Sequence, residues 1–182
     1  MILREINNDL TLRSFTVDDS EELFQLTDRS REYLGQWLPW VDFTKEVKDT
    51  KEWIQASLKG FVETGGYIKT AAIIYKGSIA GTIGFNIIDK SNKSGVIGYW
   101  LGEGFQGKGI MTQACKALID YGFLELGLNR IEINVATENL KSKAIPERLG
   151  MIHEGTKRQV ERIGDKFNDH QVYSVLANEW EK

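Results

Sequence analysis

The segment Gly102-Glu-Gly-Phe-Gln-Gly-Lys-Gly-Ile-Met111 has the residue types of an anion-binding loop. It lies between an apolar, strand-like run and a segment of helical periodicity. The first turn of a helix leaves about four main-chain N–H groups unpaired at the positive end of the helix dipole, and glycine lets an anion approach them. The segment therefore predicts a phosphate-binding turn. A glycine-rich turn without a ligand is the alternative.

Two phosphate-binding motifs match this segment only in part. Gly102, Gly107 and Lys108 fit most of the nucleoside-triphosphatase pattern, but Gly109 stands where that pattern needs a Ser or Thr hydroxyl for magnesium. The glycine spacing also matches the dinucleotide-binding fingerprint, whose acidic residue is expected about 20 positions later. Here the next strand is expected to end late, near Glu138. Both motifs belong to folds that start from a parallel βαβ unit, whereas the preceding strands are predicted to be antiparallel.

A third interpretation takes Gln106-Gly-Lys-Gly-Ile-Met111 as the phosphate loop. These residues resemble the Gln/Arg-x-x-Gly-x-Gly/Ala motif of the GNAT superfamily, the acyl-CoA-dependent N-acetyltransferases. Met111 departs from the small residue that ends the motif. The resemblance extends to Ile97-Gly-Tyr-Trp-Leu101, Met111-Thr-Gln-Ala114, Asn129-Arg-Ile131 and Asn139-Leu-Lys-Ser-Lys-Ala-Ile-Pro-Glu-Arg-Leu-Gly150. Together these segments are similar to the branch that acetylates the N-termini of ribosomal proteins.

The resemblance implies both a fold and a cosubstrate. The implied fold class is α+β (mixed α/β): a twisted, mostly antiparallel sheet with a central V-shaped splay, flanked by helices on both faces. Acetyl-CoA is the implied cosubstrate, with its pantetheine arm on the strand before the loop and its pyrophosphate on main-chain N–H groups of the loop. The implied cofactor-binding residues are Tyr99, Trp100, Leu101, Gln106, Gly107, Lys108, Gly109, Ile110, Met111, Asn139 and Ser142.

Acetyl transfer to an amine needs a neutral amine and a proton for the departing thiolate. An α-amine with a pKa of about 8 is about a tenth neutral at pH 7, whereas a lysine, at about 10.4, needs roughly 3 kcal/mol more to lose its proton. A modest base therefore suffices for an N-terminal substrate. By similarity to the branch, Ser142 lies beside the CoA sulfur and protonates it, and Glu161 is the base. The alternative is that Asn139 only caps a helix and that Ser142 and Glu161 are solvated surface residues.

The remaining nucleophilic and metal-ligating residue types carry no predicted chemistry. A covalent acetyl-cysteine route would need a reactive thiolate. Cys115 falls on the apolar stripe of its expected helix with Met111 and Leu118, so we expect a core thiol and direct transfer. His153 and His170 are isolated and lack metal-ligand spacing, so they receive no catalytic role and no metal is expected.

The predicted acceptor is the N-terminal α-amine of a ribosomal protein. In similar proteins the tryptophan-rich corner leads into the acceptor cleft, so Trp37 and Trp40 are candidate substrate contacts; core packing is the alternative. Two other functions stay open: acetylation of a small amine such as a polyamine, an amino acid or an antibiotic, and a non-catalytic acyl-CoA-binding sensor. A homodimer or higher homo-oligomer is expected from the resemblance alone.

The elements that must position these residues follow from hydrophobic periodicity. Strands are predicted at residues 9–15, 67–75, 78–88, 95–101, 130–135, 151–163 and 167–176. Helices are predicted at residues 18–31, 47–64, 111–126 and 139–149. Pro39 disfavours a helix through the corner at residues 34–40. We find no linker or repeat, so one acetyltransferase domain is expected over residues 1–182.

Composition narrows the function class. The 182 residues are 41% apolar and include one cysteine, so a core without disulfides or structural metal is expected. A balance of 23 basic against 26 acidic residues disfavours a nucleic-acid partner. The longest apolar run, Ala71–Tyr75, is far shorter than the ~20 residues of a membrane span. The N-terminus lacks the apolar stretch of a secretory signal, so we expect a cytoplasmic protein without a membrane partner.

Overall fold

The computed structural model describes residues 1–63 and 65–180, except for the side chains of residues 61–63. The strands are β1 Ile2–Asn7, β2 Leu10–Arg13, β3 Thr70–Tyr75, β4 Ser78–Asp89, β5 Ser94–Leu101, β6 Arg130–Ala136, β7 Ile152–Ile163 and β8 Lys166–Leu176. The helices are α1 Ser20–Arg29, α2 Arg31–Gly35, α3 Val47–Glu63, α4 Ile110–Leu124, α5 Leu140–Arg148 and α6 Ala177–Trp180, with short 3-10 turns η1 Val17–Asp19 and η2 Pro39–Phe43. None of the described helices is long and apolar enough to cross a membrane.

Every predicted strand and helix is present, with ends that differ by a few residues. Thr64, the last residue of the helix predicted at 47–64, lies outside the described residues. Four elements were not predicted: β1, α6 and the two short helices at the tryptophan-rich corner, α2 and η2. At that corner α2 ends at Gly35, and Pro39 occupies the first position of η2, where a missing N–H does no harm.

The strands form one eight-stranded sheet in the order β1-β2-β3-β4-β5-β6-β8-β7. The pairs β1/β2, β2/β3, β3/β4, β6/β8 and β8/β7 are antiparallel. β5 and β6 are parallel, in a register that runs from Ser94–Arg130 to Ile97–Ile133, so this ladder ends inside both strands. Seven consecutive buried residues, Ile79–Phe85, show that both faces of β4 are covered. The mixed α/β, mostly antiparallel fold is thus confirmed.

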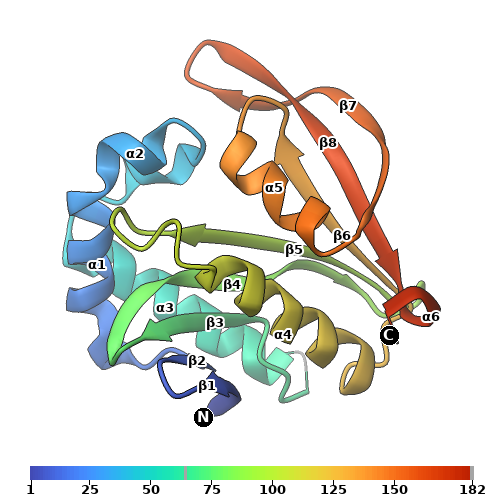
Figure 1. Cartoon of the computed structure of the whole chain (residues 1–182). Coiled ribbons are helices and arrows are strands. Elements are labelled where there is room, and N and C mark those ends of the chain that lie inside the picture. The colour runs from blue at the N-terminus through green and yellow to red at the C-terminus, as the bar shows by residue number, and fades with distance from the viewer. Residues whose placement is uncertain (64, 181–182) are drawn as a thin grey trace. The chain divides into compact units, whose positions relative to one another are not determined.

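The chain divides into two compact units, and the single-domain expectation stays a prediction. The first unit comprises residues 1–84 and 99–114, and the second comprises residues 85–98 and 115–182. β4, β5 and α4 (Figure 1) each contribute residues to both units.

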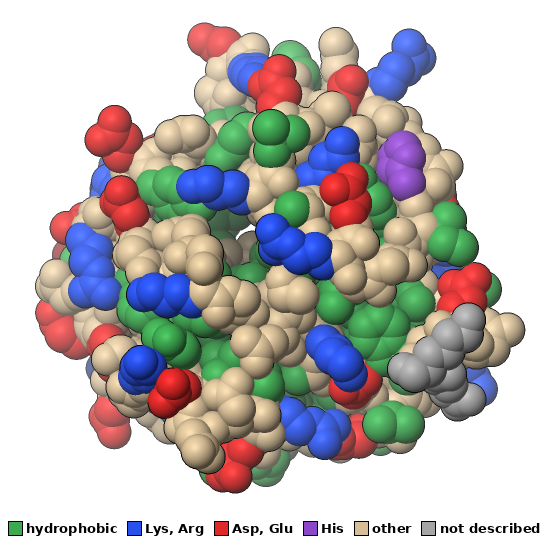
Figure 2. Space-filling model, viewed as in Figure 1, with side chains coloured by type: hydrophobic (Ala, Val, Ile, Leu, Met, Phe, Trp, Pro, Cys, Tyr) green, Lys and Arg blue, Asp and Glu red, His purple; other side chains and the backbone are tan. Residues whose placement is uncertain are grey.

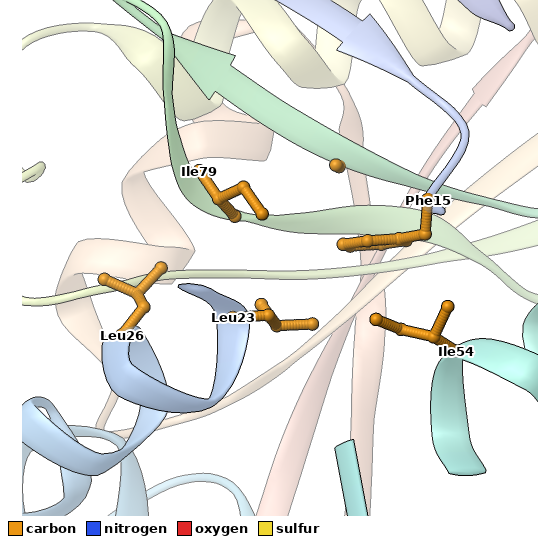
Figure 3. Packing of buried hydrophobic residues seen from close by; sticks show 6 residues of the cluster. Phe15, Leu23, Leu26, Ile54 and Ile79 are labelled. Carbon is orange, nitrogen blue, oxygen red and sulfur yellow. The ribbon is translucent and has the colours of Figure 1, made fainter. Parts of the chain in front are cut away.

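The first unit is built on a core between β2–β4, α1 and α3. Its buried side chains are Phe15, Leu23, Leu26, Ile54, Ala72 and Ile79. Figure 3 labels five of them, Phe15, Leu23, Leu26, Ile54 and Ile79, which gather around one interior. The start of α1 is fixed by Asp19, whose carboxylate accepts the Thr16 N–H at 2.7 Å and both terminal nitrogens of Arg13 at 2.7 and 2.8 Å. Burial of Asp19 opposes its ionisation, but these hydrogen bonds outweigh it and lower its pKa.

The second unit holds the rest of α4, β6, α5 and the long β7–β8 hairpin drawn in orange and red in Figure 1. Gly122 lets α4 lie close to β6, because a Cβ there would be 2.7 Å from Ile131 Cδ1. α5 packs beside β6. β6 also pairs with β8, so it holds both α5 and the hairpin, which carry the predicted chemical groups of this unit.

Candidate active site

Three glycines with left-handed backbones turn the chain between β5 and α4. Gly104, Gly107 and Gly109 have φ angles of +94°, +74° and +71°. A Cβ at Gly104 or Gly107 would meet no atom within 4 Å, so the requirement for glycine comes from backbone conformation rather than from space. The loop predicted from sequence therefore has a backbone that other residue types would adopt only with strain.

The main-chain N–H groups at the start of α4 are the anion-binding feature of this loop. The Gln113 N–H donates to the Gly109 carbonyl at 3.2 Å. The N–H groups of residues 110–112 precede this bond and have no intrahelical acceptor. Met111, the residue that departs from the motif, has a buried side chain that is 5% exposed, so its bulk lies in the interior. The geometry suits a diphosphate held by main-chain donors at a helix N-terminus.

Gln106 braces the loop from within. Its side-chain Nε2 donates to the carbonyls of Gly102 at 2.7 Å and Leu101 at 3.3 Å. Its Oε1 accepts the Gly104 N–H at 2.9 Å. The amide thus bonds to the loop backbone at three points, which fixes the turn. A direct contact of Gln106 with a cofactor stays a prediction.

Lys108 also bonds to the loop. Its Nζ donates to the Gly104 carbonyl at 2.9 Å. The ammonium group lies over the rings of Tyr75 and Phe105, 5.8 and 5.7 Å from their centroids, and these two rings meet edge to face. Lys108 therefore adds positive charge beside the cradle while its side chain closes the turn.

The loop is fastened to β4 and to the end of α1. The Gly102 N–H donates to the Ala80 carbonyl, and the Glu103 N–H donates to Ser30 Oγ, both at 2.9 Å. Ser30 is fully buried. A Cβ on Gly102 would lie 2.1 Å from Leu26 Cδ1, so glycine allows close approach here. These contacts anchor the turn to the core of the first unit.

One predicted substrate-contacting tryptophan meets one predicted cofactor-binding residue. The ring of Trp40 in η2 lies 5.6 Å, centroid to centroid, from the ring of Trp100 in β5. Arg31 holds η2 by donating to the Val41 carbonyl at 2.7 Å. Trp37 and Trp40 are both half-buried, so each keeps an exposed edge. The roles of Trp37 and Trp40 as substrate contacts stay predictions.

In the second unit, Asn139 and Ser142 form the start of α5. Asn139 is the N-cap of this helix, and its side-chain oxygen accepts the Ser142 N–H at 3.3 Å. The cap fixes the first turn and therefore the position of the Ser142 hydroxyl. The cap geometry is one of the two alternatives left open by the sequence, and it is compatible with the catalytic role predicted for Ser142.

Glu161, the predicted base, pairs with a histidine to which the sequence assigned no role. Glu161 Oε2 lies 3.0 Å from His170 Nε2 across the β7–β8 hairpin. The two side chains are 27% and 18% exposed. The signal in the sequence was the Gly164-Asp165 turn, because pairing outward from it puts residues 161 and 170 on one face as diagonal neighbours.

A second polar cluster in this unit is an ion-pair network. Arg130 binds Glu154 through two nitrogens, at 2.5 and 2.8 Å, and Glu132 at 2.7 Å. Hydrogen bonds from Arg130 and Ser174 lower the pKa of Glu154 to about 2. Asn134 donates to Glu132, while its own Oδ1 is buried without a partner among the described residues. Arg130 thus keeps Glu154 ionised, which makes that carboxylate a poor proton acceptor at neutral pH.

Comparisons with known proteins agree with this geometry. The family description that matches is the acetyltransferase (GNAT) domain, over residues 9–152. The chain belongs to the GNAT acetyltransferase family. The ribosomal-protein-serine acetyltransferase of Escherichia coli (strain K12) is 32% identical over 174 residues, which are 96% of each chain.

Two solved GNAT structures cover nearly the whole chain. RimL, a ribosomal L7/L12 alpha-N-protein acetyltransferase in complex with coenzyme A, matches with a TM-score of 0.89 and 29% identity, over 97% of this chain and 98% of that chain. The microcin C7 self-immunity acetyltransferase MccE, in complex with acetyl-CoA and AMP, matches with a TM-score of 0.87 and 33% identity, over 94% of each chain. The protein is therefore an acetyl-CoA-dependent acyltransferase, as predicted.

GNAT membership favours the third of the three phosphate-loop motifs, and the binding roles of residues 106–111 stay predictions. The strands before the loop, β2, β3 and β4, pair antiparallel as predicted, but the loop itself lies in a parallel unit of β5, α4 and β6, so strand direction does not discriminate against the two nucleotide motifs. What excludes the triphosphatase motif is Gly109, which offers no hydroxyl for magnesium. In the described part of the chain, no group of three or more His, Cys, Asp or Glu side chains could hold a metal ion.

Cys115 has the properties of a core residue. Its side chain is fully buried, and burial raises the pKa of its thiol far above neutral. A buried neutral thiol is neither nucleophilic nor accessible.

Acidic and basic side chains are interspersed over the face of this GNAT protein in Figure 2, in line with its small net charge.

Proposed function

We propose that this protein transfers acetyl from acetyl-CoA to the α-amine at the N-terminus of a ribosomal protein, by direct transfer and in the cytoplasm. The choice of a ribosomal protein as the acceptor is supported by the near full-length similarity to enzymes named for ribosomal-protein acetylation. The buried Cys115 thiol supports a route without an acetyl-enzyme. We also propose a homo-oligomer, which light scattering after size-exclusion chromatography tests directly.

Main-chain groups of the first unit would bind the cosubstrate. The free N–H groups of residues 110–112 would receive the pyrophosphate, and main-chain groups of Tyr99–Leu101 would pair with the pantetheine amides. Asn139 would lie beside the pantetheine arm. Acetyl-CoA, when bound, supplies a thioester carbonyl that an amine can attack. Main-chain N–H groups of β5 would stabilise the oxyanion that forms.

Two side chains of the second unit would move the protons. Glu161 takes one proton from the acceptor ammonium, so that the neutral amine can form the new N–C bond. As the C–S bond breaks, Ser142 gives its hydroxyl proton to the sulfur, and the second proton released by the nitrogen restores the hydroxyl. An α-amine needs roughly 3 kcal/mol less than a lysine to become neutral, which favours an N-terminal acceptor.

The test is a thiol-release assay combined with mass spectrometry of the acceptor. The panel contains N-terminal peptides of ribosomal proteins, the same peptides with a blocked N-terminus but a free lysine, and a set of small amines. We expect acetylation of free N-termini and none of the blocked peptides. Acetylation of blocked peptides at lysine would overturn the α-amine assignment.

A small amine is the second candidate, and one observation favours it. MccE, whose structure holds acetyl-CoA and AMP, is as similar to this chain as the ribosomal-protein enzymes are. The same panel separates the two candidates, because an enzyme for small amines turns over the amine set and leaves the peptides unmodified.

A further inference from the structure

Glu161 and His170 form a polar contact in the second unit. The proposed function gives a role to Glu161 but none to His170. His170 Nε2 and Glu161 Oε2 are 3.0 Å apart, which is hydrogen-bond distance. Both side chains are mostly buried, at 18% and 27% exposure, yet each is reached by solvent. A charged hydrogen bond in such a setting is stronger than one on an open surface.

Glu161 and His170 are diagonal neighbours across the hairpin, because Glu161 pairs with Asn168, two residues before His170 in β8, and the register becomes irregular just beyond that pair. Lys157 lies opposite His170, and Glu161 lies opposite Asn168, so three residues of β7 face one residue of β8 between those pairs. A regular ladder would have placed residue 159 opposite His170. Bulges of this kind change the direction of a side chain and are common beside active sites.

The bulge is held by a specific strained residue. Gln159 has a φ of +51°, in the left-handed region that favours glycine. Its N–H donates to Asp169 Oδ1 at 2.8 Å, which stabilises this conformation. Strained backbone held by its surroundings is a feature of sites where side-chain placement matters.

The neighbouring cation does not compete for Glu161. Lys157 faces His170 across the ladder, but its Nζ lies 3.3 Å from Glu132 Oε1. Asn168, opposite Glu161, is buried at 7% exposure. His170 is thus the side chain that meets the Glu161 carboxylate at hydrogen-bond distance.

We propose that His170 is a positioning residue for Glu161 in acetyl transfer. The inference rests on the proposed function, in which Glu161 accepts the proton of the acceptor amine. His170 donates its Nε2–H to Oε2, which fixes the plane of the carboxylate and leaves Oε1 to take that proton. The proton moves from the ammonium nitrogen to Oε1, while His170 keeps its own.

The first experiment compares three variants in the thiol-release assay, with the acceptor of the panel that the wild type uses best. His170→Ala should lower kcat about tenfold to a hundredfold, the effect of removing a hydrogen bond to a charged group, with the KM for acetyl-CoA unchanged. His170→Gln, whose amide N–H can replace Nε2–H, should recover most of the loss. His153→Ala is the matched control on the same hairpin and should keep wild-type kcat. His153 contacts the Tyr173 ring, with centroids 5.2 Å apart.

A double-mutant cycle identifies the route of the effect. In the Glu161→Gln background, His170→Ala should cause no further loss of kcat, because the carboxylate that it positions is gone. Independent, multiplicative losses would overturn the inference, as would wild-type kcat in His170→Ala or no recovery in His170→Gln. If His170→Ala does not fold, the cycle is run with His170→Phe, which keeps a ring without a donor.

Failure of the proposed function gives a different result. A wild-type protein that acetylates no acceptor overturns the proposed function, and the role of His170 in it. Wild-type kcat in Glu161→Gln overturns the base assignment and with it the role of His170, while acetyl transfer itself stands. The contact itself is read by NMR, because the chain has two histidines and His153→Ala assigns the ring signals of the other. Loss of Glu161 should shift the Nε2–H signal of His170, and an unchanged signal would overturn the pairing.

Discussion

Exchange of Gly109 for aspartate or for asparagine separates charge from shape at the predicted diphosphate cradle. Gly109 has a φ of +71°, and a Cβ there would meet only Gln113 Nε2, at 3.6 Å, so either side chain fits. Both residues tolerate this backbone better than other types and both are good N-caps, so the two variants should fold with similar stability. They differ by one negative charge.

That charge should weaken binding of acetyl-CoA. A carboxylate about 4 Å from a phosphate oxygen repels it by about 1 kcal/mol at the dielectric constant of water and by about 4 kcal/mol at an effective value of 20. Gly109→Asp should therefore bind acetyl-CoA about 5-fold to about 1000-fold more weakly than Gly109→Asn, in isothermal titration calorimetry at low salt. The gap should narrow at high salt, because ions screen the repulsion. Equal affinities of the two variants would show that the diphosphate lies elsewhere.

Three further changes test the fold and the chemistry. Gly81→Ala should lower the free energy of unfolding by about 3 kcal/mol and Tm by about 6–12 °C, because the new Cβ would lie 2.1 Å from the Trp100 carbonyl oxygen. Gly60→Ala is the control, because a Cβ at Gly60 would meet no atom within 4 Å. Equal melting curves for the two variants would contradict the close packing at Gly81. Ser142→Ala should lower kcat in the thiol-release assay at unchanged acetyl-CoA affinity, whereas unchanged kcat would remove Ser142 from the chemistry. Glu154 has a folded-state pKa of about 2 against an ordinary 4.5, so it stabilises the fold above pH 4.5, and this contribution is lost as the pH falls toward 2. In urea titrations at graded pH, Glu154→Gln should reduce the dependence of the free energy of unfolding on pH between about 4.5 and 2. An unchanged pH dependence would disprove the linkage.

The sequence predicted the loop and most elements because their signals are local. The segment from Gly102 to Met111 combines glycine with a change of hydrophobic period, and the turn at residues 104–109 has the conformation that this composition indicates. The pairing of β5 with β6 was harder to predict. Buried and half-buried residues alternate along β5 and β6, and such a pattern fits an antiparallel partner as well as a parallel one. The length of α4 was the usable signal, because a parallel connection requires such a crossover.

Side-chain partners inside the site were beyond local signals. Gln106 belongs to the cofactor motif, yet the structure shows its amide bonded to three main-chain groups of its own loop. The turn at residues 164–165 makes Glu161 and His170 diagonal neighbours, but the bulge that puts Lys157 opposite His170, and the left-handed backbone of Gln159 within it, have no signal in the sequence. Register irregularities of this kind arise from tertiary constraints, so a residue count along the strands does not reveal them.

The two units would contribute different kinds of groups: main-chain groups that bind the cosubstrate in the first, and side chains that transfer protons in the second. In the loop, the Gln106 amide is bonded to the loop backbone, and Lys108 donates to a loop carbonyl while it adds positive charge, so the directional donors for an anion are main-chain N–H groups, whose placement depends on the glycines. In the second unit, the groups that can move protons are side chains, Ser142 on a capped helix and Glu161 on a bulged strand. Glycine substitutions in the loop should therefore change affinity for acetyl-CoA, and substitutions of Ser142, Glu161 or His170 should change turnover. If the loop substitutions changed turnover and the substitutions of Ser142, Glu161 or His170 changed affinity for acetyl-CoA, this assignment of binding to the loop and of proton transfer to the second unit would be wrong.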